Sequence, residues 1–386
     1  MRNKKRLLAP GPTPVPERVR LALAQDMIHH RKPEFKAIMA QVQQRLQKLF
    51  GTTQPVMPLA CSGTGVMTAA VTNLFAAGEK VLVIEAGKFG ERWGEICNAS
   101  NVVVEKLVLD WGEAVTAEAI ANMLDIHPDC KGVLVQLSET STGVLHPVDE
   151  IAGVTKDRNV LLVVDGISAV SISPCSMDEW GIDCLLTGSQ KGLMLPPGLG
   201  LIACSDKAWQ KAESVTPSCF YFNLRAEKQK ILQNQTLFTT PVNLIVGLNE
   251  SLAMFEETGF DAVFRKQWAL TMMARTAIAE MGLELFAKDH FTWGLTSVLV
   301  PENVDASAAL EYAKEQFGVT LAGGQAHMKG RLVRIGHMGW VDWADLAAGL
   351  HAFAEGCKAC GGSITSGYLE KGLHAYHSAL NDSEIL

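Results

Sequence analysis

Asp165 and Lys191 are the residues of this sequence whose types and spacing point most directly to chemistry. The apolar run 160–164 ends at the aspartate, and the run 184–186 is followed by Ser189-Gln190-Lys191. An apolar, proline-containing segment, residues 192–198, comes directly after the lysine. Burial in such surroundings disfavours the ammonium form and lowers the pKa of a lysine. The amine then becomes a nucleophile of the kind that forms Schiff bases.

A carboxylate and a nucleophilic lysine after neighbouring strands are the pair that pyridoxal 5'-phosphate (PLP) requires. The aspartate pairs with the protonated pyridine nitrogen and keeps the ring an electron sink, and the lysine holds the aldehyde. Taken singly, Asp165 could cap a turn and Lys191 could be an ordinary loop lysine. Together they predict two catalytic residues that also bind PLP.

Bulk composition describes a well-cored globular chain. The 386 residues suffice for two domains, and 48% are hydrophobic and 19% charged. A net charge of −7 without a long basic run argues against a nucleic-acid partner. Residues 1–6 are basic, but the apolar run 7–9 is too short for a signal sequence. No apolar stretch approaches the ~20 residues of a membrane span, so no membrane partner is expected.

Cysteine usage points to a reducing compartment. The nine cysteines are an odd number scattered along the chain, which favours reduced thiols in a cytoplasmic protein over a disulfide framework. Cys357 and Cys360 form a lone CxxC with no second one nearby, so we predict no metal site and leave their role open.

Strand-like and helical patterns alternate between about residues 56 and 205. Strands are predicted at 81–84, 132–137, 160–164 and 184–186, and helices at 33–50, 66–75 and 91–99. This alternation predicts an α/β fold with a mostly parallel sheet covered by helices. Later patterns predict a smaller α+β domain, with helix 260–281 and strands 295–300, 319–322 and 331–335. The expected units are an N-terminal arm (1–15), a large domain (16–258) and a small C-terminal domain (259–386). The tail from Gly361 is expected to be weakly helical and mobile.

Ser62-Gly63-Thr64 leads directly into the predicted helix 66–75. Free amides and the dipole at a helix start favour an anion such as a phosphate, and the two hydroxyls add donors. A dinucleotide site is the rival interpretation, because Gly63-Thr64-Gly65 begins a GxGxxG pattern. Position 68 is threonine, however, and no clear strand precedes the turn, so the rival is disfavoured.

Phe89 and Ser141 also follow predicted strands. Phe89 could stack on a flat ring or be an ordinary core residue, and Ser141 lies in a loop rich in hydroxyl side chains. The carboxyl ends of parallel strands meet at one edge of a sheet. We therefore expect these two residues to converge with Ser62, Asp165 and Lys191.

Arg334 is a charge within the apolar segment Arg331-Leu-Val-Arg334-Ile-Gly336. Arginine can bind a carboxylate through two parallel hydrogen bonds. The alternative is a solvated arginine on an edge strand.

Taken together, these motifs resemble the class V aminotransferases of PLP fold type I, in particular the alanine–glyoxylate, serine–pyruvate and serine–glyoxylate group. The similar segments span nearly the whole chain to about residue 355. They are Pro10-Gly11-Pro12-Thr13, His30-Arg31-x-Pro33-Glu34-Phe35, Ser62-Gly63-Thr64, Glu139-Thr-Ser141-Thr-Gly143, Asp165-Gly-Ile167-Ser, Ser189-Gln190-Lys191, Thr239-Thr-Pro241 and Arg334-Ile-Gly336. The resemblance implies a large domain with a mostly parallel seven-stranded sheet.

The resemblance also implies a role for each matching residue. Lys191 would carry the internal aldimine, Asp165 would pair with the pyridine nitrogen, and Ile167 would pack under the ring. Arg334 would bind the substrate α-carboxylate, and Ser141 would bond the ring oxygen or the substrate. The remaining implied contacts are Ser62, Gly63, Thr64 and Gln190 at the phosphate, Phe89 stacked on the ring, and Gly11 at the substrate.

A homodimer with active sites at its interface is implied as well, because Thr239 would reach the phosphate of the neighbouring subunit. Two positions depart from the family pattern. Phe89 stands where tryptophan is frequent, and a phenyl ring offers less stacking area. Thr236 stands where some members place a tyrosine on the partner's phosphate.

The function that these expectations favour is transfer of an amino group from alanine or serine to glyoxylate or pyruvate. An aspartate-using aminotransferase, a cysteine desulfurase or lyase of the same fold, and a non-catalytic subunit stay open as alternatives. A desulfurase needs a cysteine on a mobile loop, and no cysteine is placed in that way.

Overall fold

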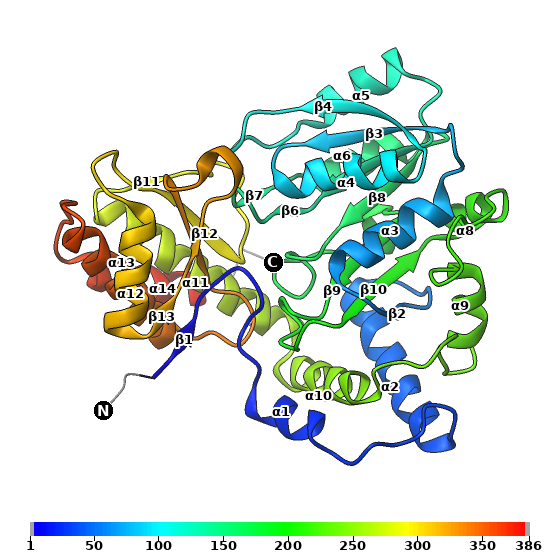
Figure 1. The fold of residues 1–386 in the computed structure, drawn as a ribbon, viewed down its shortest axis with the longest axis horizontal. Helices are drawn as coiled ribbons and strands as arrows, with labels where there is room; N and C mark the ends of the chain where they lie inside the picture. The colour runs from blue at the N-terminus through cyan, green and yellow to red at the C-terminus, as the bar shows by residue number, and fades with distance from the viewer. Residues whose placement is uncertain (1–3, 383–386) are drawn as a thin grey trace.

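The core of the molecule is a seven-stranded sheet, on the right of Figure 1. The computed structural model describes residues 4–382. In spatial order the strands are β2 (Met57–Ala60), β10 (Leu199–Cys204), β9 (Cys184–Gly188), β8 (Leu161–Asp165), β5 (Gly132–Gln136), β3 (Lys80–Glu85) and β4 (Val103–Val108). Only β10 runs antiparallel to its neighbours; the other pairings are parallel. The predicted α/β class and mostly parallel sheet are confirmed.

The central strands are apolar throughout because both faces of the sheet are covered. Every residue of β5, β8, β9 and β10 is buried, so these strands read as continuous hydrophobic runs without alternation. Among the covering helices, α3 (Gly63–Leu74) contacts β9 and β10, and α4 (Lys88–Ala99) contacts β3, β4 and β5. The other helices of this region are α1 (Glu17–Leu23), α2 (Pro33–Phe50), α5 (Ala117–Ile126), α6 (Val148–Thr155), α7 (Met177–Trp180), α8 (Asp206–Glu213), α9 (Leu224–Ile231) and α10 (Val242–Thr258).

A four-stranded antiparallel sheet forms the smaller unit, on the left of Figure 1. Its strands, in spatial order, are β11 (Glu284–Leu285), β12 (Leu295–Leu299), β15 (Leu332–Gly336) and β14 (Ala322–Gly323). Its helices are α11 (Phe260–Glu280), α12 (Ala306–Phe317), α13 (Trp343–Ala359) and α14 (Tyr368–Leu380). The single strand predicted over 319–322 is wrong in detail. Val319–Thr320 (β13) pairs with Arg6–Leu7 (β1), whereas β14 pairs with β15.

Two separate hydrophobic clusters correspond to these two sheets. One includes residues from Val19 to Phe255, and the other joins Leu8 to residues between Ala269 and Ala379. Helix α11 links them, because Phe260 and Val263 pack on the first cluster whereas later residues belong to the second. The domain limits expected from the sequence, 16–258 and 259–386, agree with this division into two clusters and stay a prediction.

Two expectations need correction. The described part of the tail is a well-packed helix: α14 lies against α11, and Tyr368 and Tyr376 are buried there. A strand does precede Ser62, since β2 ends at Ala60. It is an edge strand paired antiparallel to β10 alone, so it lacks the central, parallel position of a dinucleotide-binding strand.

Within residues 4–382, no helix is both long and apolar enough to cross a membrane.

Candidate active site

Residues that follow β2, β3, β5, β8 and β9 gather at one edge of the large sheet. An added Cβ at Gly63 would lie 2.5 Å from the Ile167 side chain, and one at Gly87 would lie 2.5 Å from the Ser141 hydroxyl oxygen. Asp165 in turn interacts electrostatically with Lys191. The predicted convergence of these strand ends is therefore present in the structure.

Lys191 lies at the centre of this group and is 9% exposed. Its Nζ donates a hydrogen bond to the carbonyl oxygen of Pro10 at 2.5 Å. Burial lowers the pKa of Lys191 to about 8, with Asp165 opposing the shift and Arg334 adding to it. The neutral amine is consequently accessible near physiological pH, as nucleophilic attack on an aldehyde requires.

The N-terminal segment closes over Lys191. The Thr13 hydroxyl donates to the backbone oxygen of Lys191 at 2.8 Å, and the Thr13 amide donates to the oxygen of Gln190 at 3.0 Å. Gly11 is needed for this approach, because it has a φ of 130° and a Cβ there would come within 2.5 Å of the lysine amine. Gly11 therefore lies at the lysine amine, and its contact with a substrate stays a prediction.

Asp165 ends β8 and is 4% exposed. Its Oδ1 accepts a hydrogen bond from the Ile167 amide at 2.8 Å. Burial raises the pKa of Asp165 to about 7. The hydrogen bond from Ile167 and the charge of Lys191 lower this pKa, whereas the charge of Glu139 raises it further. A cation held beside this carboxylate would favour its ionised form, so the residue fits a protonated pyridine nitrogen.

The start of α3 fits a phosphate. Ser62 is the N-cap residue but makes no side-chain capping bond, and the first amides of a helix have no partner within it. Among residues 4–382, Oε1 of Gln190 is buried without a hydrogen-bond partner; because this oxygen is an acceptor, only the Nε2 group of Gln190 could donate to a phosphate. Arg92 brings a positive charge, with its guanidinium 3.4 Å from the Thr64 hydroxyl. Available donors and a cation around a helix start form an anion site.

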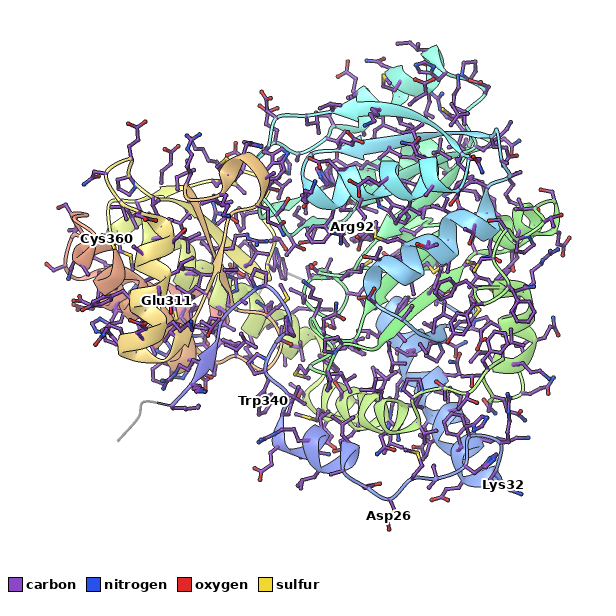
Figure 2. All side chains as sticks on the ribbon, viewed as in Figure 1. Asp26, Lys32, Arg92, Glu311, Trp340 and Cys360 are labelled. Carbon is purple, nitrogen blue, oxygen red and sulfur yellow. The ribbon has the colours of Figure 1, made fainter. Side chains whose placement is uncertain are left out.

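Phe89 lies in the first turn of α4, and the Arg92 guanidinium lies 4.8 Å from the centre of its ring. Figure 2 labels Arg92 between the ribbons of α4 and α3. Ser141 is completely buried, and its hydroxyl donates to Glu139 Oε1 at 2.5 Å. Both residues are at the predicted site, and their contacts with PLP stay predictions.

Arg334 is on β15, an inner strand of the small sheet, and is 8% exposed. Its Nε and Nη2 donate to the oxygen of Gly323 at 3.0 and 2.9 Å, and Nη1 donates to the oxygen of Thr140 at 3.0 Å. The alternative of a solvated edge arginine is thus wrong. The bond to Thr140 holds this guanidinium across the two units, next to the loop of Ser141.

Thr239 lies apart from this group. It is exposed in the segment between α9 and α10, where it lines a small pocket with Ala60, Tyr221 and Phe222. Within residues 4–382, no hydrogen bond joins it to the other predicted site residues. The hydroxyl of Thr236 donates to the backbone oxygen of Phe238 at 2.8 Å, a bond within its own loop.

Three contributors were given no role from the sequence, although Glu139 and Pro10 lie in segments that carry the family resemblance. Glu139 is buried between Phe89 and Ser141, Arg92 reaches Thr64, and the Pro10 carbonyl receives the lysine amine. Arg92 could have been found one helical turn beyond Phe89, since residues i and i+3 share a helix face. Within the described residues no three His, Cys, Asp or Glu side chains gather as a metal site would require.

Comparison with known proteins places the chain in a family. The model of the class-V aminotransferases matches residues 12–341. The "Soluble hydrogenase, small subunit" of a Synechococcus species is 38% identical, over 91% of this chain and 92% of that protein. The serine–glyoxylate aminotransferase of Methylorubrum extorquens is 33% identical over 87% of each chain.

The solved structure of a Thermus thermophilus aspartate aminotransferase of subgroup IV is 30% identical and superposes with a TM-score of 0.86. It covers 92% of this chain and 100% of that one. The resemblance read from the sequence is confirmed: the chain belongs to the class-V aminotransferases, PLP-dependent transferases of fold type I.

Proposed function

We propose that this aminotransferase moves an amino group from a small amino acid, alanine or serine, to a small 2-oxo acid such as glyoxylate or pyruvate. The observation that carries the proposal is one buried group of three charges. Lys191 interacts electrostatically with both Asp165 and Arg334. A nucleophilic amine, a carboxylate for a pyridinium and a guanidinium for a carboxylate are thereby assembled in one place.

PLP fits the residues at this place. Lys191 would bind its aldehyde covalently, Asp165 would face its ring nitrogen, and Ile167 would support one face of the ring. Ser62 and Gln190 would hold its phosphate, together with Gly63 and Thr64. When bound, PLP supplies an electron sink for the charge left on the substrate Cα after its proton is removed.

The chain's own residues would then orient the substrate and move the proton. Arg334 binds the α-carboxylate and fixes the direction of the Cα–H bond. Lys191 would take the Cα proton on its Nζ as a general base and release it again as a general acid. Its lowered pKa suits both roles, because the best acid–base catalysts titrate near the working pH.

A specific observation favours aspartate as the second candidate donor. Arg92 also reaches this group, since its charge acts on both Asp165 and Lys191. A second guanidinium could receive the side-chain carboxylate of aspartate. The Thermus relative is named for that amino acid.

A cysteine desulfurase and a non-catalytic subunit both have less support. Cys61 precedes Ser62, but burial raises the pKa of its thiol to about 12, which disfavours the thiolate that a desulfurase needs. One relative is named as a hydrogenase subunit. A non-catalytic subunit, however, would not require the buried Lys191–Asp165–Arg334 group that this chain contains.

The proposal includes a homodimer in which Thr239 reaches the partner's phosphate site. Thr239 is exposed, and beside it Tyr221 stacks on Phe238 with a 5.2 Å separation of ring centres. Phe220 is 87% exposed in the same region. An apolar aromatic patch next to an exposed hydroxyl is what a partner subunit would cover.

A panel of amino donors against glyoxylate, pyruvate and 2-oxoglutarate tests the substrate class. We expect alanine or serine with glyoxylate or pyruvate to give the highest kcat/KM. A preference for aspartate would transfer the assignment to the second candidate. Lys191→Ala should abolish turnover, by roughly 10⁴-fold or more for loss of both nucleophile and base. The exposed Lys288→Ala is the matched control.

A further inference from the structure

We propose that Glu139 is an ionised positioning residue that caps α4 and accepts a hydrogen bond from the Ser141 hydroxyl. It thereby fixes Phe89 and Ser141, the two side chains expected around the cofactor ring. The proposal deepens the proposed function and rests on it for the identity of the ring. It begins with the start of α4, where the N-cap residue is Gly87. A glycine offers no side chain to the unpaired amides of a first helical turn.

Those amides are satisfied from the loop after β5. The Phe89 and Gly90 amides donate to Glu139 Oε2, each at 3.1 Å, and the Lys88 amide donates to the Ser141 hydroxyl oxygen at 2.9 Å. Glu139 is therefore an N-cap supplied from 49 and 50 residues away. A Cβ at Gly87 would lie 2.5 Å from the Glu139 side chain, so glycine is required for this approach.

The other carboxylate oxygen serves Ser141. Oε1 of Glu139 accepts the Ser141 amide at 3.0 Å and the Ser141 hydroxyl at 2.5 Å. Four donors thus face the two oxygens of Glu139. A carboxylate accepts in all four directions, whereas a protonated acid would satisfy these contacts only if the Ser141 hydroxyl accepted in place of donating.

Burial and hydrogen bonding act on Glu139 in opposite directions. Complete burial raises the pKa of Glu139 above its ordinary value, and the bonds from Ser141, Gly90 and Phe89 oppose this rise without cancelling it. A helix N-terminus is the place where a buried negative charge is stabilised. Three of the four contacts come from backbone amides, which can only donate, and together with the helix N-terminus they support the ionised form.

The direction of the Ser141 proton follows from the same contacts. An ionised Glu139 can only accept, so the contact with Oε1 requires the Ser141 hydroxyl to donate its single proton there, while its oxygen accepts from the Lys88 amide. The hydroxyl therefore has no proton left for the ring oxygen of PLP or for the substrate, in contrast to the role inferred from the family resemblance. Ser141 acts through Glu139 and α4, and Phe89 is held over the ring position by the amide bond to the same carboxylate.

The charge of Glu139 also reaches the reacting groups. It raises the pKa of Asp165 and supports the cationic form of Arg334. Replacing it with glutamine keeps the size, but it removes the charge and leaves one acceptor oxygen where the carboxylate offers two, so the NH₂ group faces a backbone donor in either orientation. The variant should therefore change both the order of the α4 start and the titration of Asp165.

The test uses Glu139→Gln with Asp183→Asn as the matched control. Asp183 is a buried carboxylate at the opposite end of β9, where it accepts from the Leu162 amide and the Ser205 hydroxyl. In cofactor-free protein, Glu139→Gln should speed hydrogen exchange of the Lys88, Phe89 and Gly90 amides by at least tenfold. It should also lower the midpoint of the Asp165 titration, followed by the chemical shift of its carboxyl carbon. Asp183→Asn should change neither. Unchanged exchange and an unchanged midpoint in Glu139→Gln would overturn the proposal.

A second comparison separates direct from indirect action of Ser141. With PLP bound, Glu139→Gln should raise the PLP dissociation constant roughly tenfold, whereas Ser141→Ala should speed exchange at Lys88 and leave the wavelength of the visible absorbance band unchanged. A band shift in Ser141→Ala with none in Glu139→Gln would show a direct bond to the ring and contradict the proposal. If the wild-type protein binds no PLP, the proposed function fails, and the exchange data in cofactor-free protein still decide the role of Glu139.

Discussion

The two ends of the candidate site, which we propose would hold the PLP ring and the PLP phosphate, are built differently. At the ring end, Asp165, Glu139, Ser141 and Arg334 are buried and their polar atoms are bonded to the chain itself. At the phosphate end, Ser62 and Thr64 are exposed, as is Thr239 in its separate loop.

This difference indicates which part of the site one chain completes alone. At the ring end, hydrogen bonds within the chain already hold these groups without a ligand, so we expect them to need little reorganisation during the reaction. The phosphate end keeps donors available, and its affinity depends on the anion and, in our proposal, on a second subunit. Changes at the ring end should therefore affect chemistry, whereas changes at the phosphate end should affect cofactor retention.

Asp165→Asn should have the largest effect. A neutral amide no longer favours a protonated ring nitrogen, so the half-reaction with alanine should slow by roughly 10³-fold, about 4 kcal/mol of barrier. Stopped-flow absorbance measures this rate, and thermal unfolding checks that the fold persists. An unchanged rate would place the ring nitrogen against another residue.

Arg334→Lys should lower kcat/KM by roughly 10²-fold for every amino donor, through both kcat and KM. Lysine keeps the charge but cannot bind two carbonyls and present a planar fork to a carboxylate. The PLP content should stay normal. Loss confined to acidic donors would show that Arg334 binds a side-chain carboxylate instead.

Thr239→Val tests the phosphate end. We expect the PLP dissociation constant to rise roughly tenfold, the value of one hydrogen bond to a charged group, while kcat at saturating PLP changes little. Equilibrium dialysis measures the constant, and the exposed Thr320→Val on the small domain is the control. A fully active monomer at micromolar concentration would refute the shared site.

An effect of similar size is expected from pH. The neutral amine of Lys191 attacks the aldehyde, and with a pKa of about 8 its neutral fraction rises as pH increases through 8. The rate at which cofactor-free protein captures PLP should therefore increase roughly tenfold between pH 7 and 9 and then level off. A rate that keeps rising to pH 10.5 would assign the capture to an ordinary, exposed lysine.

The sequence predicted the residues at the ring end better than the contacts that hold them in place. Buried strands β5, β8 and β9 are continuous apolar runs, so their ends, and with them Asp165 and Lys191, were found from local pattern alone. The cap that Glu139 gives α4 was missed because it joins residues 50 positions apart. No local propensity encodes such a contact.

The same reason explains the errors in the small domain. Residues 319–322 form two short strands because β1 and β15 pair with different halves of the run. The tail was expected to be mobile because its sequence is only weakly helical, whereas α11 buries Tyr368 and Tyr376. Tertiary packing, not local propensity, fixed both segments.

The central claim is that Lys191 binds PLP and performs the proton transfer. Borohydride reduction of the PLP-loaded protein, followed by proteolysis and mass mapping, tests it most directly. We predict one pyridoxyl phosphate group per chain, located on the peptide that contains Lys191, and none in Lys191→Ala. A label on another lysine, or no label on a protein that catalyses transamination, would contradict the claim.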